Sequence, residues 1–269
     1  MQSPIAIFDS GLGGLTVMRQ VAERLPAEDI VYFGDTARVP YGIKSPETIE
    51  RFALQIVDFL IRFEPKVIVA ACNTVSATAL PALRSACRVS IFGVVIPGCA
   101  AALRASRSQR IGVIGTEATI RADAYRKTIL QHNLAATVIS RACPLLVPIV
   151  EEGRRSDDPI VAAVLREYLA PLKEARIDTL VLGCTHYPLL RPAIEREMGP
   201  QVAIVDSAVE VSRAVQAELE RLKAPGPADR RGEYLFFVTD NADRFAAIGQ
   251  RFFGQLVQNV RRIPPEMLD

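Results

Sequence analysis

The chain has 269 residues, of which 49% are hydrophobic and 23% charged, and its formal net charge is +2. This length and apolar content suffice for one large domain or two modest ones, and the small charge gives no indication of nucleic-acid binding. The N-terminal residues lack the pattern of a signal peptide, and no apolar run approaches the ~20 residues of a membrane-spanning helix. Five cysteines without a paired spacing indicate a reducing compartment. We therefore expect a soluble, cytoplasmic protein with neither nucleic-acid nor membrane partners.

The N-terminal part of the chain alternates apolar runs with segments of helical periodicity. Buried strands are predicted at residues 5–8, 29–33 and 91–96, and in a run that starts at residue 66 and ends at Cys72. Helices are predicted at residues 15–25, 45–63 and 76–86. Ser45 and Pro46 have the residue types of an N-cap and a first helical position. Pro97 and Gly98 then predict a break in the chain.

The remainder of the chain continues this alternation. Strands are predicted at residues 110–116, 138–142, 179–182, 202–205, 234–239 and, as a short edge strand, 260–263. Helices are predicted at residues 120–131, 159–175, 210–223 and 241–253, with a linker at 224–227. The second section repeats the layout of the first, from a strand with a Gly/Thr loop to a strand that ends in Cys-Thr, which indicates an internal pseudo-repeat. The alternation predicts an α/β fold with doubly wound parallel sheets.

Two cysteines follow predicted strands in similar contexts, as Cys72-Asn73-Thr74 and Cys184-Thr185-His186. In open α/β sheets, ligands bind beyond the carboxyl ends of the strands, where helix N-termini favour a thiolate. We therefore expect these two thiols to face each other across one cleft. Three other cysteines lie in apolar surroundings and are interpreted as structural: Cys87, Cys99 and Cys143.

Two further loops follow the first and second predicted strands. Residues 9–14 contain glycines spaced as G-x-G-G, not as the G-x-G-x-x-G of dinucleotide sites. We interpret this loop as a turn whose backbone donors, with Ser10, hold a small carboxylate, while Asp9 accepts from an amine or partners a thiol. The loop at 34–42 contains Pro40-Tyr41-Gly42, and it is either a structured binding loop or a surface crossover with Tyr41 packed as a lid.

Two of the reactions that a pair of cysteines could support are disfavoured by the sequence. A zinc site is disfavoured because the chain has no C-x-x-C pair and only two histidines, of which His132 lies at the polar end of a helix. A Cys–His hydrolase is disfavoured because a nucleophile and its base normally come from distant positions, so we interpret His186 as a group that tunes Cys184 or supplies a proton. Two thiols without a cofactor motif suit a reaction in which one thiol removes a proton from a carbon atom and the other returns a proton to its opposite face. Hydrogen-bond donors around the substrate would stabilise the planar intermediate.

Five segments carry a resemblance to a known family: F-D-S-G-L-G-G-L-T-V (8–17), Y-F-G-D-T-A-R-V-P-Y-G (32–42), A-C-N-T-V-S-A (71–77), I-G-V-I-G-T-E-A-T-I (111–120) and V-L-G-C-T-H-Y-P-L-L (181–190). With these segments, which span most of the chain in family order, the sequence resembles the glutamate racemases of the aspartate/glutamate racemase superfamily. Any one segment would be weak evidence, but together they are highly specific.

The resemblance implies a role for each matching residue. Cys72 and Cys184 would be the two catalytic acid/bases, with Cys72 serving the D-enantiomer and Cys184 the L-enantiomer. Asp9 would assist Cys72, while Glu151 and His186 would assist Cys184, with the adjacent Glu152 as the alternative to Glu151. The residues that match substrate-binding positions are Asp9, Ser10, Pro40, Tyr41, Gly42, Cys72, Asn73, Thr74, Cys184, Thr185 and His186, with Thr116 and Thr119 as additions.

The resemblance also implies two pseudo-symmetric α/β domains with the active site in the cleft between them. Residues 1–97 and 208–269 would form one domain and 98–207 the other, with crossings at Pro97-Gly98 and near Ser207. Family members act without pyridoxal phosphate or metal, are often dimers, and supply D-glutamate for peptidoglycan, so we expect no cofactor and a homodimer. Because the chain begins almost at the first strand, we expect no regulation through the N-terminal extension that some members carry.

Other interpretations remain open. An aspartate racemase, or a relative that acts on another small dicarboxylate, would share the thiol pair, although the Cys-Asn-Thr and Cys-Thr-His motifs favour glutamate. The protein could instead bind a partner such as a topoisomerase. It could also sense redox state through a disulfide between Cys72 and Cys184.

Overall fold

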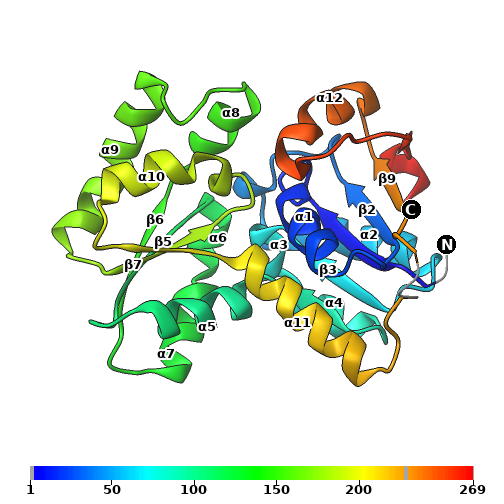
Figure 1. The fold of residues 1–269 in the computed structure, drawn as a ribbon, viewed down its shortest axis with the longest axis horizontal. Coiled ribbons are helices and arrows are strands. Elements are labelled where there is room, and N and C mark those ends of the chain that lie inside the picture. Colours follow the sequence, from blue (N-terminus) through cyan, green and yellow to red (C-terminus); the bar gives the residue numbers. More distant parts are fainter. Residues whose placement is uncertain (1–2, 227–229, 269) are drawn as a thin grey trace.

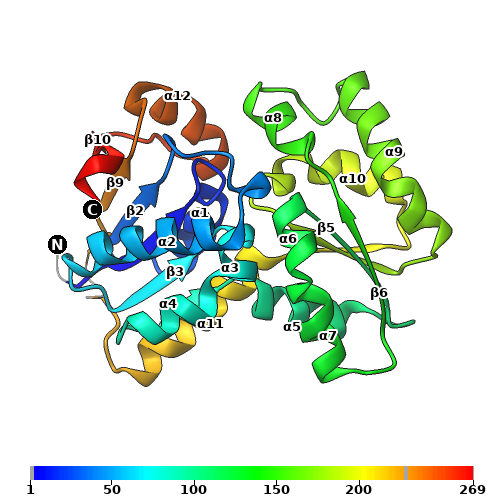
Figure 2. The same ribbon diagram turned by 180° about the vertical axis from the view of Figure 1, so that it is seen from behind.

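The computed structural model describes residues 3–226 and 230–268, and in these ranges the chain forms two lobes, each built around a parallel sheet (Figures 1 and 2). Pro227, at the end of the expected linker, lies outside the described residues. The expected α/β fold with parallel sheets is confirmed, because every pair of neighbouring strands in the described residues runs parallel.

The first sheet is built from both ends of the chain. Its strands are β1 (Ile5–Asp9), β2 (Ile30–Gly34), β3 (Val67–Ala70), β4 (Ile91–Gly93), β9 (Tyr234–Val238) and β10 (Val260–Arg262). They lie in the order β10-β9-β2-β1-β3-β4, so β10 is an edge strand, as expected for residues 260–263. The helices of this lobe are α1 (Leu15–Arg24), α2 (Pro46–Ile61), α3 (Asn73–Thr78), α4 (Leu80–Ala86), α11 (Ser207–Arg221) and α12 (Ala242–Phe253), with 3-10 turns at Tyr41–Ile43 and Pro265–Met267.

The second sheet comes from one continuous stretch of chain. Its strands are β5 (Arg110–Gly115), β6 (Thr137–Ala142), β7 (Thr179–Gly183) and β8 (Ala203–Asp206), in the order β6-β5-β7-β8. The helices of this lobe are α5 (Val95–Ala105), α6 (Glu117–Ala122), α7 (Ala124–His132), α8 (Leu146–Glu151), α9 (Pro159–Glu174) and α10 (Arg191–Met198), with a 3-10 turn at Tyr187–Leu190.

The two sheets repeat one strand order, which confirms the expected pseudo-repeat. The order β2-β1-β3-β4 in the first sheet corresponds to β6-β5-β7-β8 in the second. Because β1 pairs with β3 and β5 with β7, the loop after Asp9 lies beside the loop of Cys72, and the loop after Gly115 lies beside the loop of Cys184. These four loops leave the carboxyl ends of parallel strands, which is the edge where α/β proteins bind ligands.

Helices cover both faces of each sheet, and the strands between them are buried along their length. β1, β2, β3 and β7 are buried at every residue and are apolar except at a few end positions such as Asp9 and Thr179, as expected for parallel strands. In the first lobe, α1 and α11 pack on one face and α2 and α4 on the other (Figures 1 and 2). One hydrophobic cluster is continuous across the lobes and includes Val21, Leu169 and Phe252. This shared core fixes how the two sets of strand ends face each other.

The chain does not break at Pro97 and Gly98 as predicted. β4 ends at Gly93, so the predicted strand at 91–96 is too long, and both residues lie in α5 with Pro97 in its first turn. Proline costs no hydrogen bond there, because the first N–H groups of a helix have no intrahelical acceptor. Gly98 lets α5 approach α11, since a Cβ at this position would clash with Oγ of Ser207.

Two predicted helices are each divided. Residues 76–86 fall in α3 and α4, which meet at Ala79, because Pro81 fits only the first turn of a new helix. Residues 120–131 fall in α6 and α7, which are separated by Asp123 in the left-handed conformation with φ of 56°. Aspartate tolerates this conformation better than most residues do. Hydrophobic periodicity alone does not report such breaks.

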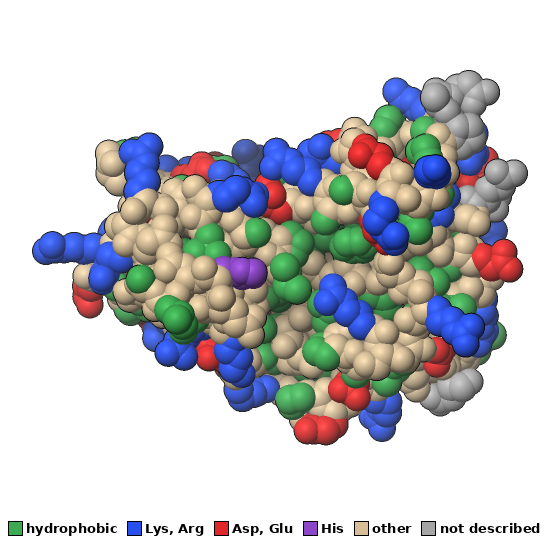
Figure 3. Space-filling model, turned by 90° about the horizontal axis from the view of Figure 1, so that it is seen from below, with side chains coloured by type: hydrophobic (Ala, Val, Ile, Leu, Met, Phe, Trp, Pro, Cys, Tyr) green, Lys and Arg blue, Asp and Glu red, His purple; other side chains and the backbone are tan. Residues whose placement is uncertain are grey.

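The surface carries charges of both signs. On the face in Figure 3, Lys and Arg side chains are interspersed with Asp and Glu side chains. Mixed charge of this kind produces only a weak long-range field. Within the described ranges, no helix combines the length and the apolar composition that crossing a bilayer requires.

Asp178 holds the turn before β5 against the start of β7, and we expect its removal to destabilise the second lobe. Its carboxylate accepts from Oγ of Ser106 at 2.6 Å and from the N–H groups of Arg107 and Ser108 at 2.7 and 2.5 Å. In Asp178→Ala these donors lose their acceptor, so the free energy of unfolding should fall by about 1–3 kcal/mol. Urea denaturation measures this change.

Asp157→Ala is the matched control, because Asp157 lies in an exposed ion pair with Arg155 at 3.6 Å. It should change the free energy of unfolding by less than ~0.5 kcal/mol. Equal losses in the two variants would show that the turn does not depend on Asp178.

Candidate active site

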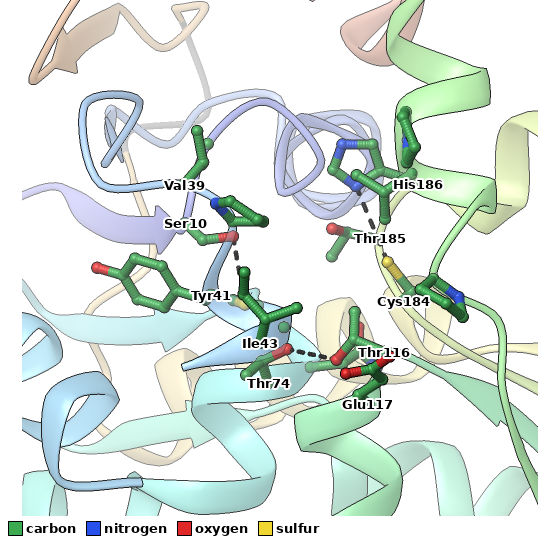
Figure 4. Close-up of a pocket in the computed structure, with 18 of the residues that line it drawn as sticks. Ser10, Val39, Tyr41, Ile43, Thr74, Thr116, Glu117, Cys184, Thr185 and His186 are labelled. Atoms are coloured by element: carbon green, nitrogen blue, oxygen red, sulfur yellow. Dashed lines mark hydrogen bonds between the residues drawn. The ribbon is translucent and has the colours of Figure 1, made fainter. Parts of the chain in front are cut away.

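A cavity of about 340 Å³ lies between the carboxyl ends of the two sheets, a size that suits a small molecule. Figure 4 shows Ser10 and Tyr41 approaching it from one side and Cys184 and His186 from the other. Its lining residues are Ser10, Gly11, Val39, Pro40, Tyr41, Gly42, Ile43, Cys72, Asn73 and Thr74 from the first lobe, and Thr116, Glu117, Pro144, Val147, Pro148, Glu151, Cys184, Thr185 and His186 from the second. The structure therefore places both expected thiols on one cavity, each from a different lobe.

Cys184 follows β7 directly and lies in a chain of contacts with His186 and Glu151. Its Sγ lies 3.9 Å from Nδ1 of His186, and Nε2 of the same ring lies 3.0 Å from Oε1 of Glu151. The neighbouring Glu152 is exposed and pairs with Arg154. The carboxylate that reaches the site is therefore that of Glu151, the last residue of α8.

His186 carries the positive charge of this chain of contacts. Burial acts to lower its pKa, but hydrogen bonds to Cys184 and Glu151 outweigh burial and raise the pKa to about 10. The same contact with His186 lowers the pKa of Glu151, although partial burial acts to raise it. A protonated imidazole next to Sγ of Cys184 stabilises negative charge on the sulfur. Phe252 of α12 packs edge-on against the imidazole, with ring centroids 5.3 Å apart.

The glycine loop of the first lobe packs against this chain of contacts. A Cβ at Gly13 would lie 2.5 Å from Nδ1 of His186, and a Cβ at Gly14 would lie 2.5 Å from Cβ of Asp9. Both distances are too short for any residue other than glycine. Thr16 follows in α1, and its Oγ1 donates to the carbonyl oxygen of Thr185 at 3.1 Å. Close packing thus explains two of these glycines, against the other lobe at Gly13 and within the first lobe at Gly14.

Cys72 has the opposite surroundings. It is 6% exposed at the N-cap position of α3, and its Sγ donates to Oγ of Ser10 at 3.6 Å. Burial and the negative charge of Asp9 raise its pKa to about 12, although hydrogen bonding with the backbone of Val75 and with Ser10 acts to lower the pKa. The sulfur of Cys72 is therefore a neutral thiol near neutral pH.

Asp9 ends β1 beside Cys72 and is 1% exposed. Its Oδ2 accepts from the N–H of Gly11 at 2.9 Å, and its Oδ1 has no hydrogen-bond partner among the described residues. Burial raises the pKa of Asp9, while the positive charge of His186 acts to lower it. Asp9 is not among the described residues that line the cavity. The structure thus places it behind the wall, next to the thiol, and not on the wall itself.

Asp35 organises the loop that carries Pro40, Tyr41 and Gly42. Its buried carboxylate accepts from Nε of Arg38 at 2.7 Å, from Oγ1 of Thr239 at 2.9 Å and from the hydroxyl of Tyr41. These bonds hold Tyr41 buried against the cavity. Of the two interpretations of residues 34–42, the structure supports the ordered binding loop.

Threonine hydroxyls join the lobes next to the cavity. Oγ1 of Thr116 lies 2.9 Å from Oγ1 of Thr74 (Figure 4) and 2.9 Å from Oγ1 of Thr119. Thr74 and Thr116 line the cavity, whereas Thr119 is buried behind them. Gly42 also approaches here, since a Cβ on it would lie 2.8 Å from Cβ of Thr116.

An apolar part of the wall is not identified from the sequence. It consists of Val39 and Ile43 from the first lobe and Pro144, Val147 and Pro148 from the second. Their residue types are also typical of a core, and only the proximity of the two prolines to Glu151 in the chain connects them with the site. The tertiary fold turns these side chains towards the cavity, and the sequence around each residue does not predict this orientation.

The remaining sulfur and histidine groups lie apart from the cavity. Within the described residues, all five cysteines are free thiols, and Cys87, Cys99 and Cys143 are not among those that line the cavity. His132 is exposed at the end of α7. No group of three or more His, Cys, Asp and Glu side chains in the described part of the chain is placed to hold a metal ion.

The arrangement is suited to proton transfer at a carbon atom held between the lobes. One wall has a sulfur next to an imidazolium, and the other has a sulfur that retains its proton. A positioned base and a positioned acid on opposite walls can remove one proton and deliver another.

Comparisons with known proteins agree with this chemistry. A family model described as Asp/Glu/Hydantoin racemase matches residues 6–215. A glutamate racemase from Geobacter metallireducens is 47% identical over 262 residues, which are 97% of each chain. Among solved structures, a glutamate racemase isoform from Bacillus anthracis matches with a TM-score of 0.93 and 38% identity over 98% of each chain. Glutamate racemase from Francisella tularensis in complex with D-glutamate matches with a TM-score of 0.92 and 37% identity, over 100% of this chain and 98% of that one.

The raised pKa of His186 can be measured directly, because the chain contains only two histidines. In an NMR titration of the imidazole signals, we expect His186 to stay protonated up to about pH 10. Since this pKa lies above the ordinary value of 6.5, the contact contributes stability below pH 6.5 and loses it as pH rises through about 10. Glu151→Gln should move the midpoint to lower pH, because it removes a negative charge that stabilises the imidazolium.

Glu152→Gln is the matched control and should leave the His186 midpoint in place, since Glu152 pairs with Arg154 at the surface. His132→Gln identifies the second signal. If both glutamate variants shift the midpoint equally, or if neither does, Glu151 is not the partner of His186 in solution.

Proposed function

We propose that this chain, which belongs to the Asp/Glu/hydantoin racemase family, interconverts L- and D-glutamate without a cofactor. The observation that carries the proposal is the pair of thiols on one cavity, Cys72 from one lobe and Cys184 from the other. The names of the relatives, and the D-glutamate bound in one of them, support glutamate as the substrate. The product D-glutamate would then serve peptidoglycan synthesis.

In the L-to-D direction, the thiolate of Cys184 removes the α-proton of L-glutamate, and the electron pair of the C–H bond stays on the α-carbon. Cys72 then donates its thiol proton to the opposite face, which gives D-glutamate. This leaves Cys72 as thiolate and Cys184 as thiol, so the D-to-L direction uses the same groups in reverse. Proton exchange restores the starting state, through Asp9 behind Cys72 and through His186 with Glu151 beside Cys184.

The charges around the two sulfurs set the resting state for the L-enantiomer. Cys184 lies beside the imidazolium of His186, whereas burial and Asp9 keep the pKa of Cys72 at about 12. The imidazolium that would stabilise a thiolate therefore lies on the Cys184 wall. D-glutamate requires that Cys72 first loses a proton, and the raised pKa of Asp9 suits that carboxylate to accept it.

The α-proton of an amino acid is a very weak acid, so the wall must stabilise the planar carbanion-like state. Hydroxyl, amide and backbone groups around the cavity supply hydrogen bonds to the carboxylates and the ammonium group. The apolar wall excludes water and strengthens these bonds. The binding residues that we propose are Ser10, Pro40, Tyr41, Gly42, Asn73, Thr74, Thr116 and Thr185 on the wall, with Asp9 and Thr119 acting from behind it.

The proposed organisation follows from the same resemblance. The predicted domains are residues 1–97 with 208–269 and residues 98–207, but a boundary after Pro97 would divide α5, so we place the first crossing just before this helix. We propose a homodimer, for which exposed apolar side chains outside the cavity, such as Leu134 at 89% exposure, are available. The free thiols favour a reducing compartment, which supports a cytoplasmic location.

The activity can be tested with the purified protein in D2O without added cofactor. We expect both L- and D-glutamate to lose optical rotation while deuterium enters the α-carbon, because the incoming proton comes from a thiol that has exchanged with solvent. Polarimetry and NMR measure the two changes together, with L-aspartate as the comparison. If aspartate racemises and glutamate does not, the substrate is wrong but the thiol mechanism stands. If neither gains α-deuterium, the proposal fails and the partner-binding or redox alternative is favoured.

Each cavity thiol should be required for inversion. We expect Cys72→Ala and Cys184→Ala each to lower the racemisation rate by about 10²–10⁴-fold or more, because each removes one acid/base group. Cys87→Ala removes a thiol outside the cavity and should keep its activity. A fully active Cys72→Ala or Cys184→Ala variant would rule out the two-thiol mechanism.

A further inference from the structure

We propose that Tyr125 is a positioning residue for the Cys72 half of the reaction, through a hydrogen bond that crosses between the lobes to Asn73. The proposal rests on the proposed racemase function and adds a residue from outside the cavity wall. Tyr125 belongs to α7 of the second lobe, whereas Asn73 begins α3 in the first lobe. The hydroxyl therefore holds a loop that is covalently part of the other lobe.

The contact is short and buried. Nδ2 of Asn73 donates to the hydroxyl oxygen of Tyr125 at 2.7 Å, and Tyr125 is 2% exposed. Burial raises the pKa of Tyr125, so the hydroxyl stays neutral at the pH of catalysis. Asn73 lines the cavity and directly follows Cys72, while Tyr125 is not among the described lining residues. The bond to Asn73 thus links the hydroxyl to the Cys72 side of the cavity, whereas the ring of Tyr125 also packs near Gly183, which precedes Cys184. Removing the hydroxyl while keeping the ring therefore tests the bond to Asn73.

The pseudo-repeat provides a counterpart on the other wall. Thr16 lies in α1 of the first lobe, and its Oγ1 is within hydrogen-bond distance of two carbonyl oxygens, that of Gly13 at 2.9 Å and, across the lobes, that of Thr185 at 3.1 Å. Thr185 directly follows Cys184, just as Asn73 directly follows Cys72, so each lobe sends a hydroxyl to the residue next to the cysteine of the other lobe. Tyr125 supports the Cys72 loop and Thr16 supports the Cys184 loop. The two residues can therefore be compared as opposite perturbations of one reaction.

Ordinary rates cannot separate the two walls. Enantiomers have equal free energies in water, so kcat/KM must be equal in the two directions for every variant. Primary isotope effects do separate them, because α-deuterated L-glutamate gives up its deuteron to Cys184 and α-deuterated D-glutamate gives it up to Cys72. The isotope effect on kcat/KM is larger for the direction whose proton-removal step limits the rate.

In Tyr125→Phe, we expect kcat/KM to fall by up to about 10²-fold in both directions, because a small displacement of reacting groups can slow a reaction by this factor. Because the Cys72 step becomes more rate-limiting, the isotope effect with α-deuterated D-glutamate should rise and that with α-deuterated L-glutamate should fall, relative to the unmodified protein. Thr16→Val should shift the two isotope effects in the opposite sense. The measurement uses purified full-length variants and competitive deuterium washout in both directions.

Tyr168→Phe is the control for losing a buried tyrosine hydroxyl, because Tyr168 bonds to the backbone N–H of Leu145 and not to a cavity residue. It should leave both isotope effects unchanged. In an Asn73→Ala background, Tyr125→Phe should have no further effect on the isotope effects, because the bond that it removes is already absent. Circular dichroism checks that each variant folds.

Three outcomes would overturn the proposal while the racemase function stands. Tyr125→Phe could leave the isotope effects unchanged, could shift them in the same sense as Thr16→Val, or could shift them equally in the presence and absence of Asn73. Failure of the proposed function itself is distinguishable, because the unmodified protein would then show no exchange of the α-proton with either enantiomer.

Discussion

The site depends on one interaction, a protonated imidazole held between a sulfur and a carboxylate. Burial raises the pKa of Cys72, Cys99 and Cys143 to about 12, so a buried thiol in this protein is neutral unless a nearby charge opposes burial. Cys184 is similarly buried but has His186 at 3.9 Å, and Glu151 fixes the ring from the other side. The charge of one ring therefore distinguishes the surroundings of the two sulfurs.

The fold supplies the second requirement, access to both faces of one carbon. A single sheet gathers its strand ends on one edge and can reach a small substrate from one side. Two sheets with the same strand order, joined by a continuous apolar core, place two such edges against each other. The two lobes share the path of the backbone and the position of the cysteine. The polar groups near each sulfur differ: Asp9 lies on one wall, and His186 with Glu151 lies on the other. The two walls therefore share a backbone arrangement but differ in the charges around their sulfurs.

The sequence predicted the strands, the repeat and the two thiols because those features are local: an apolar run ends and a reactive residue follows it. The local sequence does not decide whether Glu151 or Glu152 reaches the site, because this depends on which face of α8 turns inward. Pro97 misled the prediction because a proline in the first turn of a helix looks the same in sequence as a proline that ends a strand. The position of Asp9 behind the wall and the bond between Tyr125 and Asn73 depend on how the lobes pack. Patterns within one segment carry no information on that packing.

The place of β9 and β10 in the first sheet has a consequence for synthesis on the ribosome. The second sheet is complete once residue 206 has emerged, because its strands come from one continuous stretch. The first sheet contains β1, the earliest of the described strands, yet it is completed only by residues 234–262, which emerge after the whole second sheet. The Cys184 lobe can therefore fold as a unit during translation, while the Cys72 lobe keeps the edge of β2 unpaired until the end. A nascent chain that stalls before β9 exposes that edge, and the end of the chain rather than its beginning decides when the first lobe closes.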